Sequence, residues 1–443
     1  MPITSPTALK FHLIYNIMKK SISIIAAAAA LAGAFFFSSC NRKEVASIPE
    51  VKVQVNMPAD FPEDAVFNGT VVMINQGTKA ILEAVAENGV ASFKKVPYGV
   101  YYFSASWVLP NADFKAMAPE LAADLTSDII FNSSTIAATL ATDADAAEPV
   151  VLNLAWSVPS SLVISRLYNF GTLNLANKAF NIDKYLEIYN NSNETQYVDG
   201  LFLGEAYGSA VSPSPYTDVT TADVCYLQRV VRIPGTGNQY PVEPGKSIVV
   251  AQNAMNHIKA DVVTNTVDLS GADFECYVQG APASMFPADN ADVPNIEEIF
   301  GASNSTAKFF AGQGTVPVLF KMDLEAFYSL DMILAPGTDA YGTQYAFYCK
   351  ALPVSAIIDA VDTYRVGFEN RASDHVPSSV DAGRAAVNQK NISLRKIAYF
   401  TEDGRAVLQD TNNSTNDFVI VESTDGSVLV PRKYDLVQIQ PAD

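Results

Sequence analysis

Hydrophobic and polar residues alternate in short stretches along the first part of the chain, and this is the period of a β-strand with one buried face. The stretch Val51-Lys52-Val53-Gln54-Val55 is the first example. Similar stretches, separated by turn residues, lie at 70–74, 80–86, 91–96, 100–107 and 150–156. The pair Asn88-Gly89 favours a tight hairpin turn. The pattern predicts an antiparallel β domain, with an inserted helix or loop at 112–131 and an acidic surface loop at 141–148.

From residue 161 onward the pattern changes to a larger β region with longer loops. Strands are expected at 162–167, 185–189, 247–251, 345–349, 392–399 and 406–409. The predicted fold class is therefore all-β, with two domains, long loops and a few short helices. In the 185–189 strand, alternation points Glu187 away from Leu186 and Ile188, which predicts a half-exposed strand with Glu187 in solvent.

Residues 18–39 read as an export signal, because a basic start is followed by an apolar run and then by small residues. Two lysines precede the apolar run 22–37, and Cys40 follows two serines. This ending resembles the lipobox of bacterial lipoproteins, in a loose form similar to that of Bacteroidota. The strict lipobox has Leu in place of Phe37 and Gly or Ala in place of Ser39.

The lipobox resemblance implies that Cys40 becomes the lipidated first residue of the mature chain. Several acyl chains there would attach the protein to a membrane permanently. The expected location is the outer membrane, facing the cell surface or the periplasm. Residues 1–17 are then an upstream misannotation, and residues 40–49 form a polar tether. The alternative is an uncleaved membrane anchor, although the apolar run is shorter than the roughly 20 residues that span a bilayer.

The chain is strongly acidic, with a formal net charge of −18. This charge repels phosphate backbones, so no nucleic-acid partner is expected. Hydrophobic residues make up 49% and aromatic residues 10% of the sequence, which is enough apolar surface to build cores and argues against a disordered chain.

The cysteines and histidines have no metal-site spacing. The three cysteines after Cys40 are Cys225, Cys276 and Cys349. They are interpreted as small buried hydrophobic residues, with one disulfide among them left open. His257 and His375 are far apart in sequence, so a metal site or a catalytic triad would depend on the fold bringing the right groups together. His257 is expected in a surface turn.

Two groups of segments resemble known β modules. The hairpin Asn88-Gly89 to Phe93, followed by Pro97-Tyr98-Gly99, is similar to that of transthyretin-like, carboxypeptidase-regulatory β-sandwiches. This implies a sandwich over 50–156 that serves as a spacer. A lamin-tail-like immunoglobulin sandwich over 157–443 is implied by the segments 162–168, 183–191, 197–201, 244–251, 357–361 and 395–396. Together they resemble DUF4876, a family of Bacteroidota lipoproteins without an established activity.

Two polar groups are weak calcium candidates, because Ca²⁺ prefers oxygen ligands. Asp183 and Glu187 form the first, together with Asn190. The run 410–414, Asp-Thr-Asn-Asn-Ser, is the second, with a sugar contact as a further possibility. It is interpreted first as a turn whose short side chains bond their own backbone. No other cofactor is expected.

The segment 204–245 is rich in Gly, Ser, Pro and Thr and is interpreted as long loops on a rigid β scaffold, where binding surfaces concentrate. Its tyrosines could stack on a sugar ring or a planar iron chelate, or contact a partner protein. The alternative is that the loops fold back and bury the rings. These tyrosines are Tyr207, Tyr216, Tyr226 and Tyr240.

The leading functional hypothesis is a non-enzymatic envelope lipoprotein, because an export anchor precedes two β modules and the sequence has no GxSxG, HExxH or P-loop motif. Its sandwich would present a surface for a glycan or an iron chelate such as haem, with an outer-membrane nutrient transporter as partner. One alternative is a carboxylate-based hydrolase, with or without calcium. Another is an adhesin or filament subunit, which would need an open sheet edge for a donated strand.

Overall fold

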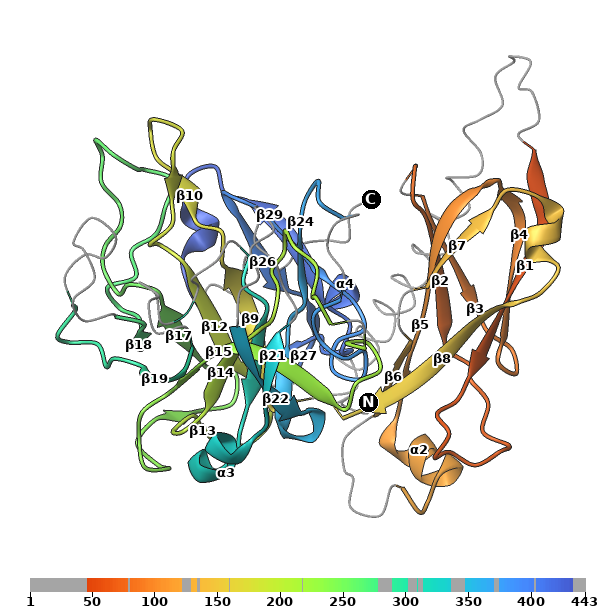
Figure 1. Cartoon of the computed structure of the whole chain (residues 1–443), viewed down its shortest axis with the longest axis horizontal. Coiled ribbons are helices and arrows are strands. Elements are labelled where there is room, and N and C mark those ends of the chain that lie inside the picture. The colour runs from red at the N-terminus through yellow and green to blue at the C-terminus, as the bar shows by residue number, and fades with distance from the viewer. Residues whose placement is uncertain are drawn as a thin grey trace, which may run out of the picture. The chain divides into compact units, whose positions relative to one another are not determined.

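The computed structural model of the chain is mostly β-structure, and the predicted all-β class is confirmed (Figure 1). It describes residues 46–78, 80–121, 129–133, 136–158, 160–216, 218–277, 289–301, 309, 314–335, 347–369, 374–401 and 404–432. Cys40, the predicted export signal and residues 1–17 lie outside the described residues, as does most of the predicted tether. No helix within these ranges is long and apolar enough to cross a membrane.

The first domain is a sheet that curls around one core. Its strands are β1 (Ser47–Asn56), β2 (Thr70–Asn75), β3 (Ile81–Val85), β4 (Val90–Pro97), β5 (Gly99–Leu109), β6 (Ile129–Ser133), β7 (Ile136–Leu140) and β8 (Val150–Ser157). They follow the order β3-β2-β5-β6-β8-β1-β4, and β7 pairs with β5. Alternate side chains such as Val51, Val53 and Val55 enter the core, as the sequence pattern predicts. The domain is not wholly antiparallel, because β1 pairs with β8 in parallel.

Local sequence signals explain the turns of this domain. Asn88 and Gly89 both have positive φ, 51° and 80°, as a tight hairpin turn requires, so the predicted turn is confirmed. The predicted insertion at 112–131 begins as the helix α2 (Asn111–Met117), but its last residues belong to β6. The acidic segment 141–148 contains the exposed 3₁₀ turn η1 (Asp143–Ala146), and Asp145 bonds back to the backbone nitrogen of Thr142 at 2.7 Å.

The second domain contains two large sheets. The six-stranded sheet has the order β18 (Phe274–Glu275), β17 (Ser247–Ala251), β12 (Tyr185–Asn190), β9 (Leu162–Tyr168), β26 (Asn391–Arg395) and β29 (Phe418–Glu422). The seven-stranded sheet has the order β21 (Met332–Ala335), β22 (Phe347–Pro353), β15 (Val224–Arg232), β14 (Phe202–Ala206), β20 (Pro317–Phe320) and β23 (Ile357–Ala360), and β19 (Glu297–Phe300) pairs with β15.

Smaller elements connect these sheets. The short strand pairs are β10 (Thr172–Leu173) with β11 (Ala179–Phe180), β13 (Gln196–Tyr197) with β16 (Pro241–Val242), β24 (Thr363–Arg365) with β25 (Ala385–Val387), and β27 (Ile397–Phe400) with β28 (Ala406–Leu408). The helical turns are α3 (Leu324–Ser329), α4 (Ser414–Asp417), η2 (Val354–Ala356) and η3 (Ser427–Leu429).

The two large sheets pack face to face, so the second domain is sandwich-like. Their shared core includes Ile164 and Ile188 from the six-stranded sheet and Leu203, Val231 and Leu319 from the seven-stranded sheet. Each sheet also buries its other face. On the six-stranded sheet this outer cluster includes Tyr168, Tyr185 and Leu394, and on the seven-stranded sheet it includes Phe202, Phe320 and Phe327.

Burial on both faces corrects several predictions. Every residue of β12 is buried, and Glu187 is 0% exposed, so the prediction of a half-exposed strand with Glu187 in solvent is wrong. The predicted strand at 392–399 is two strands, β26 and β27, which lie in different sheets. The predicted strand at 345–349 corresponds to β22, which continues to Pro353. The segment 204–245 is not a continuous loop, because its middle forms β15.

Candidate functional site

A buried arginine, Arg395 at the end of β26, has three aspartate carboxylates around its guanidinium. Nη2 donates to the two carboxylate oxygens of Asp359 at 3.0 and 2.7 Å. Nη1 donates to Asp410 at 3.0 Å and lies 3.7 Å from Asp417. All four residues are at most 7% exposed. Because Asp359 comes from β23, this cluster links the six-stranded sheet to the seven-stranded sheet.

The charges in this cluster do not balance, since three acids face one base. Burial raises the pKa of Asp417 to about 6, although Arg395 opposes the shift. Burial also raises the pKa of Asp359, and the nearby Asp410 carboxylate adds to this rise while Arg395 opposes it. With so little exposure these carboxylates cannot meet a substrate. The cluster therefore joins β26, β23 and the segment 410–417 within the fold.

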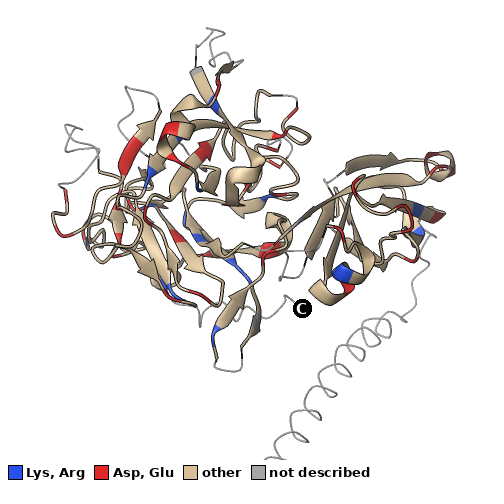
Figure 2. Ribbon diagram, turned by 90° about the horizontal axis from the view of Figure 1, so that it is seen from below, with Lys and Arg blue, Asp and Glu red and all other residues tan. Residues whose placement is uncertain are grey.

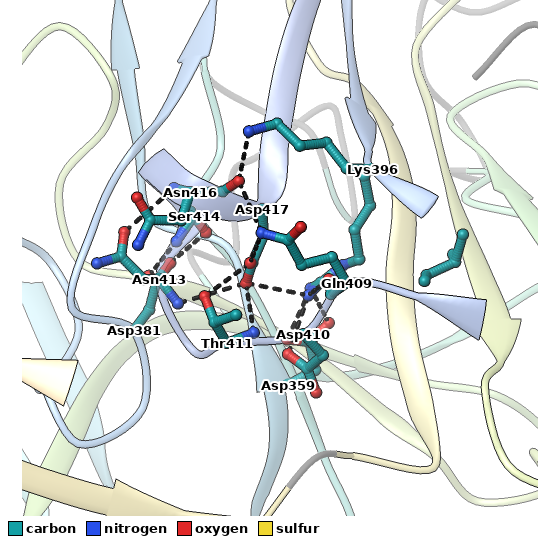
Figure 3. Close-up of polar contacts among 12 residues, drawn as sticks. Asp359, Asp381, Lys396, Gln409, Asp410, Thr411, Asn413, Ser414, Asn416 and Asp417 are labelled. Carbon is teal, nitrogen blue, oxygen red and sulfur yellow. Dashed lines mark hydrogen bonds and ion pairs between the residues drawn. The ribbon is translucent and has the colours of Figure 1, made fainter. Parts of the chain in front are cut away.

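Asp381 extends the network beside this cluster. It accepts hydrogen bonds from the backbone nitrogens of Ser414 and Asp362, each at 2.8 Å, and from the Ser414 hydroxyl. Asp417 accepts bonds from the backbone nitrogen and hydroxyl of Thr411 at 2.8 and 2.7 Å (Figure 3). The run 410–414 therefore leads into α4, whose N-cap is Asn413.

His375 and Asp362 form a second buried charged pair. Nδ1 of His375 lies 2.7 Å from the Asp362 carboxylate, which also accepts the His375 backbone N–H at 2.6 Å. Nε2 lies 2.8 Å from the backbone carbonyl of Ser212. The Ser212 carbonyl can only accept, so Nε2 donates to it, and the Asp362 carboxylate favours a second proton on Nδ1. Burial lowers the pKa of His375, but Asp362 outweighs burial and the net shift is upward.

Three of the four predicted tyrosines lie together. Tyr216 stacks on Tyr226, with ring centres 3.7 Å apart and planes 13° apart, and Tyr207 meets Tyr216 edge to face at 6.0 Å. We call these three residues the tyrosine cluster. Tyr207 and Tyr216 are partly exposed, and Tyr226 is 7% exposed. The cluster packs against Ile333 on β21 and Cys349 on β22.

Hydrogen bonds hold the buried end of the tyrosine cluster. The Tyr226 hydroxyl donates to Asp218 at 2.8 Å, and burial, followed by this carboxylate, raises the pKa of Tyr226 to about 12. The backbone N–H of Tyr207 donates to the carbonyl of Tyr226 at 2.8 Å. The loop is thus tied to β15 through both backbone and rings.

Tyr240 does not join the tyrosine cluster. Its ring packs edge to face on Phe274 at 4.9 Å, against the main core of the second domain. Its backbone nitrogen donates to Asp199 at 2.8 Å, as do those of Gly237 and Gln239 at 3.1 and 2.8 Å. The 235–240 loop is therefore wrapped around one carboxylate.

Asp183 and Glu187, which belong to the first calcium candidate, have separate sets of partners. Asp183 is buried and accepts hydrogen bonds from Tyr168 at 3.1 Å and Thr266 at 2.6 Å, and burial raises its pKa to about 6. Glu187 lies 3.5 Å from the guanidinium of buried Arg166 and accepts the backbone N–H of Arg432 at 2.8 Å. Among the described residues, no group of three or more His, Cys, Asp or Glu side chains is placed to hold a metal ion.

The three described cysteines and His257 are buried. Cys225, Cys276 and Cys349 are free thiols, and burial raises the pKa of Cys349 to about 11. His257 is 1% exposed, so its predicted place in a surface turn is wrong. Its Nε2 lies 3.0 Å from the carbonyl of Asn253, and its ring meets Phe180 edge to face.

Sequence reasoning missed the buried charged network. One available signal was Asp359 within the apolar run 357–361, since a single acid in a strand with apolar neighbours usually needs a buried partner. Arg395, at the end of an apolar strand, is the matching signal. The sequence does not show that these two residues meet.

Comparison with known proteins gives a family for part of the chain. Residues 243–424 match the family model described as "Protein of unknown function (DUF4876)". The predicted resemblance to DUF4876 is therefore confirmed over these residues, which contain the whole Arg395 cluster, Asp381 and the Asp362–His375 pair. The tyrosine cluster precedes the matched range.

One solved structure to which this chain is similar is a DUF4876 family protein from Bacteroides thetaiotaomicron. It shares 20% sequence identity, the match covers 84% of this chain and 94% of that chain, and the TM-score is 0.48. No curated protein matches this chain.

Proposed function

We propose that this chain is a non-enzymatic lipoprotein of the cell envelope, anchored through Cys40, whose second domain presents a binding surface for nutrient uptake at the outer membrane. The observation that carries the proposal is the tyrosine cluster, in which the partly exposed residues Tyr207 and Tyr216 pack against the buried Tyr226. Tyrosine rings offer an apolar face and a polar edge, which suits a sugar ring or a planar iron chelate.

The placement of the carboxylates supports a binding role over a hydrolytic one. A hydrolase that uses carboxylates needs two of them at a surface that substrate can reach. The carboxylates that converge here are buried around Arg395 and bonded to it. Other acidic residues are spread over both domains (Figure 2).

A second candidate function is assembly by strand addition, and β21 favours it. This strand lies at the end of the seven-stranded sheet, and its Met332 and Leu334 side chains are 55% and 54% exposed. Tyr348, opposite Leu334 on β22, is 51% exposed. An edge with outward apolar side chains and without lysine or proline can accept a strand from another chain.

The binding surface can be tested with a soluble form of the protein that lacks the residues before the first domain. This protein is titrated with haem and with a set of soluble glycans. Tyr207→Ala and Tyr216→Ala should each weaken binding roughly 30-fold, the size of a typical interface anchor. The matched control is Tyr328→Ala, since Tyr328 is 49% exposed and lies outside the tyrosine cluster. Equal binding by all variants, or no binding of any probe, would count against the proposal.

The anchor is tested separately, by fractionation and acyl labelling of the full-length chain. Cys40→Ser should leave the export signal intact but abolish both acyl labelling and processing at this site. Acyl-labelled, fully processed protein from Cys40→Ser would refute the lipoprotein assignment.

A further inference from the structure

His375 joins the buried charged network to the loop that carries two of the cluster tyrosines. Its Nε2 holds the carbonyl of Ser212, between Tyr207 and Tyr216 in the chain. Gly208 packs directly on the imidazole, because a Cβ there would lie 2.4 Å from Cδ2 of His375. The loop therefore rests on the ring at two points.

The hydrogen bond between His375 Nε2 and the Ser212 carbonyl depends on how many protons the Asp362–His375 pair carries. Ser212 offers a carbonyl and Asp362 a carboxylate, so the ring needs a hydrogen on each nitrogen to bond both. When one proton leaves to solvent, a single ring hydrogen faces two acceptors, and one hydrogen bond is lost. The Asp362 carboxylate also holds the His375 backbone N–H at 2.6 Å, so the bond to the loop is the one free to open.

The charged groups around the ring favour its protonated form. Asp362 contacts the ring, Asp374 is the adjacent residue, and Arg384 before β25 is the opposing cation. The Asp381 carboxylate accepts a hydrogen bond from the backbone nitrogen of Asp362. Burial, followed by the negative charge of Asp362, raises the pKa of the Cys225 thiol on β15. Carboxylates thus outnumber the cation, in agreement with a pKa raised above the ordinary histidine value.

We infer that the Asp362–His375 pair is a pH-sensitive latch for the 207–216 loop: the imidazolium holds Ser212 and keeps the tyrosine cluster assembled, and deprotonation releases the loop. The inference deepens the proposed function, because release would also weaken any ligand bound at Tyr207 and Tyr216. The latch itself requires no ligand.

Hydrogen exchange of the 207–216 amides between pH 5.5 and 8.5, corrected for the intrinsic exchange rate, measures the latch directly. In the wild-type protein, protection should fall roughly tenfold as pH rises, which is the loss of about one charge-assisted hydrogen bond. The midpoint should equal the His375 pKa measured by NMR. His375→Gln should remove the pH dependence, whereas the control His257→Gln, also at a buried histidine, should retain it.

Two results would overturn the latch. One is wild-type protection that does not change with pH, and the other is the same midpoint in His375→Gln. If His375→Gln does not fold, the NMR titration of the wild-type ring decides, since a His375 pKa below that of free histidine contradicts the inference. Because these readouts need no ligand, failure of haem and glycan binding would reject the proposed function and leave the latch standing. Binding that is present but independent of pH would reject the coupling alone.

Discussion

Replacing Arg395 with methionine is the sharpest test of the buried network. The change removes the partner of three buried carboxylates and deletes two further hydrogen bonds, to the carbonyls of Ile164 at 2.8 Å and Gln409 at 3.2 Å. It also removes the cation from its place 4.8 Å from the Phe418 ring centre. Breaking a buried ion pair by removing one partner costs about 3 to 5 kcal/mol. We expect at least this loss of unfolding free energy for the second domain.

The cost should depend on pH in a defined direction. Without Arg395 the three aspartates are more readily protonated in the folded state, and neutral aspartates need no cation. As the pH falls, the loss of unfolding free energy in the variant relative to the wild type should shrink by about 1.4 kcal/mol per pH unit for each extra proton that the folded variant binds. Arg395→Met should therefore be most damaging near pH 7.5 and less so near pH 5.5.

Urea unfolding can follow each domain separately, because both tryptophans, Trp107 and Trp156, belong to the first domain. Tryptophan fluorescence reports the first domain and near-ultraviolet tyrosine dichroism is dominated by the second. Only the tyrosine transition should shift in Arg395→Met. The control Arg232→Met breaks a partly exposed pair with Glu297 and should cost at most about 1 kcal/mol. Equal shifts in both transitions, or a penalty that does not change with pH, would refute the reasoning.

Three further predictions use the same urea assay. Tyr226→Ala should cost roughly 3 to 5 kcal/mol, because the ring is buried and stacked, and a loss below about 1 kcal/mol would contradict this placement. The wild-type second domain should gain stability as pH falls from about 7 to 5. The folded pKa of Asp417, about 6, exceeds the unfolded value near 3.9, so the folded state binds more protons in this window. Asp417→Asn should therefore reduce the dependence of the unfolding free energy on pH. Gly208→Ala should lower the unfolding free energy more than Gly237→Ala does. The two glycines have similar φ, +117° and +119°, but only at Gly208 would a Cβ meet the His375 ring. Equal losses of unfolding free energy would show that backbone strain alone matters.

The sequence pattern predicted the first domain well because its strands have one buried and one exposed face. Val51, Val53 and Val55 face the core while Lys52 is exposed, so alternation is visible in the residue types. The order of the strands in the sheet, including the parallel pair β1–β8, follows from tertiary packing and has no comparable local signal.

In the second domain the hydrophobic pattern predicted β9, β12, β17 and β26 of the six-stranded sheet, but neither β18 nor β29 and little of the seven-stranded sheet. Strands β14, β15 and β20 are covered on both faces, so Phe202, Leu203 and Gly204 follow each other without a polar position to mark the period. Burial on both faces also explains the wrong placement of Glu187, which contacts Arg166 instead of water.

The candidate site was predicted only in part. The spacing of aromatic residues in a loop-rich segment led to Tyr207, Tyr216 and Tyr226, which lie together, but not to the separation of Tyr240. The charged network was missed because its pairs are distant in sequence: Arg395 meets Asp359 across 36 residues, and His375 meets Ser212 across 163. A single sequence contains no signal for such pairings.

The C-terminal contacts of Arg166 limit when the second domain can finish folding. This arginine lies on the domain's first strand, is 1% exposed, and donates to the carbonyls of Val428 and Val430, more than 260 residues later. While the chain is being synthesised, Arg166 can pair with Glu187 but lacks these two carbonyl acceptors until residues 428–430 have been made. Such long-range closure makes folding slow and leaves strands open to wrong pairing. A chain cut before residue 428 should therefore remain a target for chaperones and proteases, even though nearly every strand has been made.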